Sequence, residues 1–234
     1  MQLNDSKPTT NRRSFLGTLA LGAGAISIAS LSMPMKVVAE TEKLSFPRDD
    51  DPEAWFNKIK GKHRIVFDTT APHDIFPFAW PRVYMITNAM TGTPENNCNE
   101  VIVLRHEAIP YSMEDRLWEK YKFGEVFKIT DPATKAPSVR NMFWKPKEGD
   151  FSVPGIGNVQ IGINELQDSG AMFCACNMAL TVFSAVFAQN MNMDAAEVKK
   201  DLLSGILPGI QVVPSGVWAV GRAQEHGCNY CFVG

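Results

Sequence analysis

The sequence has little net charge, few cysteines and no long strongly apolar run. Lys and Arg number 23 against 25 Asp and Glu, which gives a formal net charge of −2. A nucleic-acid partner is not expected, because neutralising phosphates requires a basic surface. Five cysteines in 234 residues are too few for a disulfide scaffold. The apolar fraction of 45% is that of a globular protein, with one domain or two small ones.

Several common catalytic signatures are also missing. The sequence contains no P-loop, and Gly155-Ile156-Gly157 lacks the third glycine and the preceding strand of a dinucleotide-binding motif. Ser215 lies in Val-Pro-Ser-Gly-Val rather than in the G-x-S-x-G nucleophile motif, which excludes a serine hydrolase of that type. Cysteine and histidine therefore remain as the candidate reactive side chains.

The N-terminal residues have the layout of a twin-arginine export signal. Arg12-Arg13 precedes an apolar stretch over 16–31 that is diluted by glycine, and Val37-Val38-Ala39 offers small residues for cleavage. A membrane-spanning helix needs about 20 strongly apolar residues, so permanent anchoring is not expected. The sequence predicts a signal peptide over 1–39, the export machinery as a partner, and a periplasmic mature protein.

The mature chain is expected to begin with a linker and a short helix over 40–62, followed by one α/β domain over 63–234. Asp51-Pro52-Glu53 is typical of a helix start. Beyond it, short apolar runs alternate with segments of helical periodicity. The expected strands are 63–70, 100–105, 171–175, 210–213 and 229–233, and the expected helices are 81–90, 112–122, 162–167, 178–191, 194–203 and 217–225. This alternation predicts a three-layer α/β sandwich with a mostly parallel five-stranded sheet.

Residues 124–160 interrupt this alternation. The segment contains four prolines, Pro132, Pro137, Pro146 and Pro154, and we expect mostly loop. Phe143 and Trp144 are expected to be exposed there. Large exposed aromatic side chains usually mark an interface, so these two residues are candidate contacts in a homo-oligomer.

The candidate reactive residues follow the expected strands. Ligands of parallel α/β sheets bind beyond the carboxyl ends of the strands. Cys174, Cys176 and His106 are expected at that edge. Cys176 opens a helix, whose N-terminal partial charge favours the nucleophilic thiolate, and His106 could add positive charge or move a proton. Residues two apart on a strand share a face, so Cys174 could lie on the same side. Alternatively, both cysteines are small buried apolar side chains.

A second cysteine pair lies near the C-terminus. Cys228 and Cys231 have C-x-x-C spacing, which can hold zinc or iron or act as a redox pair. Together with Cys174 and Cys176 they could supply four thiolates to a metal. We expect no bound cofactor, and a thiolate-bound metal remains the alternative. Cys98 is expected in a polar loop and receives no role.

Two longer segments carry a family resemblance. Phe173-Cys174-Ala175-Cys176-Asn177, an apolar helix, and then the run 207–217 (Leu-Pro-Gly-Ile-Gln-Val-Val-Pro-Ser-Gly-Val) resemble the DsrE/DsrF-like family. The ending 222–230 is similar too. The resemblance covers most of 63–233 and is most specific over 172–233. The export signal, the insertion near 124–160, the extra Cys174 and the terminal C-x-x-C depart from the family pattern.

The resemblance implies a small α/β domain that assembles as a trimer or hexamer. It also implies that a cysteine matching Cys176 carries sulfur as a persulfide. The expected function is therefore an exported sulfur-handling protein, possessing a sulfurtransferase or sulfur-carrier activity, with a sulfur donor or acceptor protein as partner. In this scheme Cys176 attacks the donor persulfide, and Cys174 resolves the product or shares the sulfur. Two alternatives stay open: a non-catalytic metal- or ligand-binding oligomer, and an oligomeric structural module.

Overall fold

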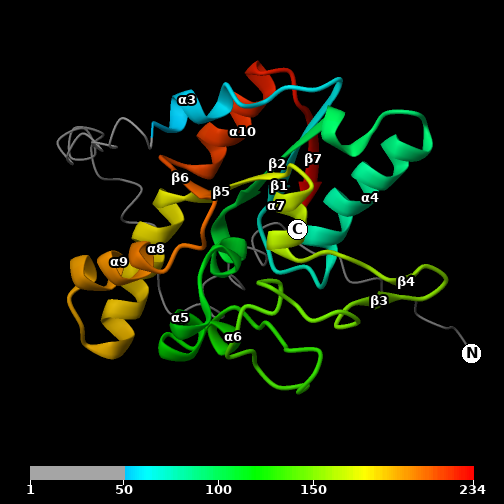
Figure 1. The fold of residues 1–234 in the computed structure, drawn as a ribbon. Helices are drawn as coiled ribbons and strands as arrows, with labels where there is room; N and C mark the ends of the chain where they lie inside the picture. Colours follow the sequence, from blue (N-terminus) through cyan, green and yellow to red (C-terminus); the bar gives the residue numbers. More distant parts are fainter. Residues whose placement is uncertain (1–50) are drawn as a thin grey trace, which may run out of the picture. The chain divides into compact units, whose positions relative to one another are not determined.

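A computed structural model of the chain describes residues 51–234, so the expected signal peptide over 1–39 lies outside the described residues. The described part is an α/β fold built on a five-stranded sheet with the strand order β6-β5-β2-β1-β7 (Figure 1). Every neighbouring pair in this sheet is parallel. The strands are β1 His63–Thr69, β2 Cys98–Leu104, β5 Met172–Cys176, β6 Ile210–Val213 and β7 Asn229–Val233.

Helices cover both faces of the sheet. One face packs against α3 Pro52–Phe56 and α10 Gly216–Glu225, with Phe56 and Ala219 in the buried cluster there. The larger cluster on the other face includes Phe67, Phe173 and Leu180. Its helices are α4 Phe76–Met90, α7 Ile163–Asp168, α8 Asn177–Met191 and α9 Ala195–Ser204. The expected α/β architecture, with a parallel five-stranded sheet between helical layers, is confirmed.

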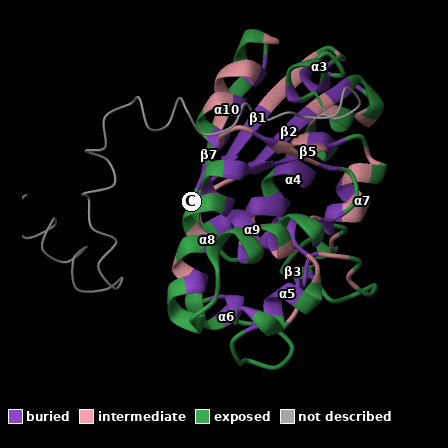
Figure 2. Cartoon of the chain, turned by 90° about the vertical axis from the view of Figure 1, so that its left-hand side faces the viewer, coloured by how far each residue is buried: buried purple, intermediate pink, exposed green. Residues whose placement is uncertain are grey.

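The strands form where the sequence has short continuous apolar runs. Val101 to Leu104 of β2 are all buried, as a strand covered on both faces requires. Figure 2 shows the same pattern for the sheet as a whole, with buried residues along the strands and exposed ones on the outer sides of the helices. Each expected strand agrees with an observed one to within two residues.

Oxygen atoms of Asp or Ser side chains cap the starts of three helices. Asp51 accepts a hydrogen bond from the Glu53 N–H at 3.0 Å, with Pro52 in the first turn. Asp194 accepts from two backbone N–H groups of α9, and Ser215 accepts from one at the start of α10. Each cap satisfies N–H groups that have no partner within the helix. Ser215 therefore has a local structural role.

Two helix boundaries differ from the expectation. Helix α4 begins at Phe76, ahead of the expected Pro81, because Pro77 occupies its first turn and Pro81 is accommodated inside it. Ser112 does not cap a helix. It ends the 3₁₀ helix η4, His106–Ser112, where its hydroxyl donates to the Ile109 carbonyl at 2.7 Å, and α5 begins only at Asp115. Helix α5 spans Asp115–Lys120, and a short 3₁₀ helix η3, Glu95–Asn97, precedes β2.

Residues 124–160 are mostly irregular, as expected, but they belong to the core. The regular pieces here are α6 Phe123–Val126 and a short antiparallel hairpin of β3 Ser152–Val153 and β4 Gly157–Asn158. Phe143 is only 1% exposed and packs on Phe78, with ring centroids 4.3 Å apart. The expectation that Phe143 is exposed is therefore wrong, and Trp144 is only partly exposed. Phe143 and Trp144 therefore give no support to the expected oligomer interface.

Asn141 explains why this segment packs inward. Its buried side-chain amide donates to the backbone carbonyls of Tyr111 and Met113, both at 2.9 Å. These bonds fix the segment to the residues that follow β2. The sequence gives no local signal for them, because the partners lie about 30 residues earlier in the chain. Within residues 51–234, no helix is long and apolar enough to cross a membrane.

Candidate functional site

The carboxyl ends of the parallel strands form one edge of the sheet, and three functional side chains lie there. Asp68 is near the end of β1, Arg105 directly follows β2, and Cys176 is the last residue of β5. Strands β1, β2 and β5 are neighbours in the sheet. These side chains therefore come together at the edge where parallel α/β sheets place their ligands.

Cys176 is held at the N-terminus of α8. It is the N-cap residue of this helix, and its Sγ accepts a hydrogen bond from the Ala179 N–H at 3.3 Å. The N-terminus of a helix carries positive partial charge, which stabilises a thiolate more than a thiol. Cys176 is 6% exposed, so protein covers almost all of its surface. The expected strand-to-helix position of Cys176 is confirmed.

Arg105 and Asp68 form an ion pair beside this cysteine. The Arg105 Nε donates to Asp68 Oδ1 at 2.6 Å, and Nη2 donates to Oδ2 at 2.9 Å. The Tyr230 hydroxyl of β7 also donates to Asp68 Oδ2, at 2.9 Å. The Asp68 side chain is almost fully buried, so its negative charge is compensated by Arg105 and Tyr230 rather than by water.

Gly216 makes room for the Arg105 side chain. A Cβ atom at Gly216, the first residue of α10, would lie 2.6 Å from both Cβ and Cδ of Arg105. Such a contact is too close for any side chain at position 216. The glycine of the Pro-Ser-Gly run therefore lets the start of α10 pack directly on the arginine.

Arg105 is a cation whose electrostatic surroundings include Cys176. The pKa of Arg105 is raised, chiefly by its hydrogen bonds to Asp68 and against the opposing effect of burial. The negative charges that Tyr230 and Cys176 can carry raise it further. The expected strand 100–105 ends at Arg105, but the sequence assigned this residue no role.

His106 lies at the same edge but in a different setting. It is exposed, begins η4, and has a left-handed backbone with φ of +51°. Its side chain forms no hydrogen bond or ion pair with any residue in the described range 51–234. The expected role of His106 beside Cys176 stays a prediction, and Arg105 is a second cation at this edge whose electrostatics include Cys176.

Cys174 does not share the surroundings of Cys176. It is fully buried in the cluster beneath α3 and α10, with Val66, Val103 and Val213. Cys176 belongs to the cluster on the other face. The expectation that the two cysteines face the same side is wrong, because Cys176 already turns into the start of α8. Burial raises the pKa of Cys174 far above that of a free thiol, and the charge of Cys176 adds to this effect.

The remaining cysteines are dispersed. Cys98 is buried at the start of β2, so the expected polar loop position is wrong. Cys228 belongs to the cluster beneath α10, whereas Cys231 packs against the cluster on the opposite face. Burial raises the pKa of Cys228 to about 11 and also raises the pKa values of Cys98 and Cys231. The C-x-x-C pair is thus divided between the two faces. Within residues 51–234, no group of three or more His, Cys, Asp or Glu side chains is arranged to hold a metal ion.

Comparison with known proteins adds no family assignment. No family model matches the chain, and no curated protein matches it either. The resemblance to the DsrE/DsrF-like family therefore stays a prediction from the residues quoted above.

Proposed function

We propose that this chain is an exported sulfur-handling protein that binds or relays sulfane sulfur through Cys176. One observation carries the proposal. The Cys176 sulfur accepts a backbone N–H at a helix N-terminus and is electrostatically coupled to Arg105. Both features favour the thiolate, the form that attacks sulfur. The described residues offer no second thiol with this combination, because burial raises the pKa of each of the other four.

The transfer step is a thiol–persulfide exchange. The Cys176 thiolate attacks the outer sulfur of a donor persulfide, R–S–SH, and a new S–S bond forms on Cys176. The S–S bond of the donor breaks, and the donor leaves as a thiolate that carries the electron pair. The proton stays on the sulfur bound to Cys176 or passes to solvent. The step moves one sulfur atom and needs no external oxidant or reductant.

The neighbouring residues have separate parts in this step. Arg105 stabilises negative charge on the reacting sulfur, and Asp68 holds the guanidinium in place. Cys174 is fully buried on the opposite face of the sheet, so it is not placed to resolve a product on Cys176. His106 is exposed at the same edge and could exchange a proton with an incoming donor. Because Cys176 is almost fully buried, a donor that carries its persulfide at the end of a slender side chain should reach it best.

The cellular setting is proposed from the sequence. The twin-arginine signal over 1–39 would deliver a folded protein to the periplasm, where a sulfur donor or acceptor protein would be its partner.

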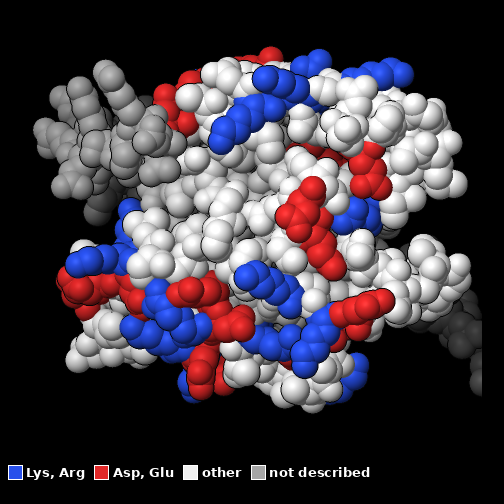
Figure 3. All heavy atoms as spheres, in the orientation of Figure 1, with Lys and Arg blue, Asp and Glu red and all other residues white. Residues whose placement is uncertain are grey.

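The family resemblance supports assembly of the protein as a trimer or a multiple of a trimer. Several apolar side chains of α4 are exposed and could serve as a contact surface: Trp80, Val83, Ile86 and Met90. Their spacing places them along one side of the helix. Charged side chains in Figure 3 lie along the top and the bottom of the view, and acidic and basic groups also lie to the right of its centre, whereas the left centre is largely uncharged.

Intact-mass measurement after exposure to a persulfide donor tests the proposal. The reduced, anaerobically purified protein should gain the mass of one sulfur atom. Cys176→Ser should gain none, and Cys231→Ser should behave as the unaltered protein. Uptake by Cys176→Ser would contradict the proposal. Stoichiometric metal on the purified protein, without sulfur uptake, would favour the metal-binding alternative, and inert thiols would favour a structural role.

A further inference from the structure

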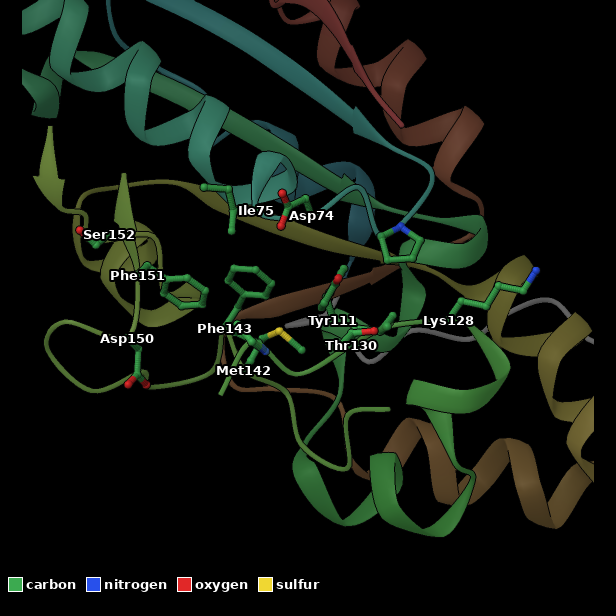
Figure 4. A pocket seen from close by; sticks show the side chains of 13 residues that line it. Asp74, Ile75, Tyr111, Lys128, Thr130, Met142, Phe143, Asp150, Phe151 and Ser152 are labelled. Carbon is green, nitrogen blue, oxygen red and sulfur yellow. The ribbon is translucent and has the colours of Figure 1, made fainter. Parts of the chain in front are cut away.

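A cavity of about 360 Å³ lies beyond the carboxyl ends of β1 and β2, under the segment 124–160. Its size is that of a small-molecule site. Residues 72–75, which follow β1, and Tyr111 of η4 form one side, and the segment 124–160 forms the rest (Figure 4). None of its lining residues is a cysteine. The sulfur-handling proposal therefore leaves this cavity without a role.

The floor of the cavity is aromatic and fixed in place. Phe143 and Phe151 stack with centroids 4.8 Å apart and planes 2° apart, and Tyr111 meets Phe143 edge-on at 5.4 Å. All three rings are buried. The Phe143 carbonyl accepts from the Ile163 N–H at 2.7 Å, and Asn141 binds the Tyr111 backbone. The floor is therefore held by hydrogen bonds that join residues 141–143 to Ile163 and to Tyr111, and it is preformed.

Two polar groups face this floor without a partner of their own. Tyr111 is 1% exposed, yet its hydroxyl makes no hydrogen bond with any residue of the range 51–234. The hydroxyl oxygen is not sealed off from the cavity, so a ligand there could form a hydrogen bond with it. Asp74 lies beside it at the mouth, and its charge adds to the effect of burial in raising the pKa of Tyr111. The hydroxyl therefore keeps its proton.

The charges around the cavity favour a cation. The lining contains Asp74, Asp150 and one cationic side chain, Lys128. Figure 4 shows the Lys128 ammonium pointing away from the aromatic rings, whereas the Asp74 carboxylate lies next to them. An ammonium group could donate to the Asp74 carboxylate and to the Tyr111 oxygen while its apolar body rests on Phe143 and Phe151.

We propose that this cavity binds a small organic ammonium compound with an apolar or aromatic body, held by Asp74, Tyr111 and the Phe143–Phe151 pair. The proposal goes beyond sulfur handling, because the site needs no thiol. The proposed ligand is positively charged. Binding of an anion through Lys128 would be the opposite result.

Calorimetric titration with three probes of one shape tests the charge: benzylamine, benzyl alcohol and phenylacetate. Benzylamine should bind about tenfold more tightly than the other two, because charge-assisted hydrogen bonds are the strong ones. Equal or tighter binding of phenylacetate would overturn the proposal. Absence of saturable benzylamine binding would also overturn it.

Variants locate the binding and separate it from the cysteine site. Asp74→Asn should weaken benzylamine binding about tenfold. Asn suits the left-handed backbone at this position, where φ is +52°, so the fold should persist. Tyr111→Phe should weaken binding severalfold, while Asp168→Asn, at an exposed carboxylate outside the cavity, and Cys176→Ser should leave it unchanged. If Asp74→Asn behaves as Asp168→Asn does, the proposed site is wrong. If Cys176→Ser abolishes sulfur uptake but keeps benzylamine binding, the two sites are independent.

Discussion

The Arg105 side chain joins the ends of two neighbouring parallel strands by donating two hydrogen bonds to the Asp68 carboxylate, at 2.6 and 2.9 Å. This two-point contact fixes the plane of the guanidinium. Asp68 also accepts from Tyr230 of the edge strand β7. One carboxylate therefore connects three strands of the sheet and orients the cation coupled to Cys176.

Removing the positive charge of this pair should destabilise the fold. Arg105→Gln leaves the buried Asp68 charge partly uncompensated, and we expect the free energy of unfolding to fall by about 2 kcal/mol. Arg116→Gln is the matched control, because Arg116 pairs with Asp201 at the surface and its removal should change stability by at most about 1 kcal/mol. Urea denaturation measures both. Equal losses of unfolding free energy in the two variants would show that the Arg105–Asp68 pair stabilises the fold no more than a surface ion pair does.

Glu100 should make stability fall as the pH rises. Its side chain is fully buried, and neither carboxyl oxygen has a hydrogen-bond partner among the described residues. Burial raises its pKa from 4.5 to about 9, while the charge of Arg82 opposes the shift. The folded state therefore holds a proton that the unfolded state releases, and stability is lost between about pH 4.5 and pH 9.

Substitution of Glu100 removes this pH dependence. Glu100→Gln keeps a neutral side chain of the same shape, so its unfolding free energy should depend less on pH, by on the order of a few kcal/mol across that range. Urea denaturation at several pH values provides the comparison, with the exposed Glu148→Gln as control. A slope in Glu100→Gln as steep as in the unaltered protein would show that Glu100 titrates normally.

Replacement of the arginine pair should block export. Arg12→Lys combined with Arg13→Lys keeps the charge but removes the paired guanidinium groups, so unprocessed protein should remain in the cytoplasm. Cell fractionation and N-terminal sequencing make the measurement, and Lys7→Arg serves as control. Periplasmic delivery of the double variant at the normal level would rule out the twin-arginine route.

Light scattering should give a molar mass in solution equal to that of a trimer or a multiple of a trimer. A monomer at micromolar concentration would contradict this prediction. Val83→Lys places a charge on the exposed apolar side of α4 and should lower the assembled mass if that surface is the contact. Val139→Lys is the control, because Val139 is exposed elsewhere, within 124–160. An unchanged mass in Val83→Lys would place the contact on another surface.

The regular elements were predictable because their signals are local. Apolar runs such as Val101-Ile102-Val103-Leu104 identify buried strands, and Asp194 or Asp51 identify helix starts. The start of α4 was missed because Pro81 also looks like a first-turn proline. Which of the two prolines lies in the first turn depends on how the helix packs against the sheet, and the local sequence does not show this.

The site was only partly predictable because its contacts are long-range. The strand ends placed Cys176 and Arg105 at one edge, but the ion pair follows from β1 lying next to β2. Tyr230 joins Asp68 from 162 residues away. Likewise, the burial of Phe143 depends on hydrogen bonds between Asn141 and the region of Tyr111. No local pattern indicates these partners.

The most direct test of the central claim is the order in which the thiols react. Reduced protein is treated with a limiting dose of iodoacetamide at several pH values, and the labelled cysteine peptides are quantified. Cys176 should label first, ahead of the more exposed Cys231, because the helix N-terminus and Arg105 favour its thiolate. Arg105→Gln should slow the labelling of Cys176 and leave that of Cys231 unchanged. If Cys231 or Cys98 labels as fast as Cys176, or if Arg105→Gln has no effect on Cys176, the proposed site is wrong.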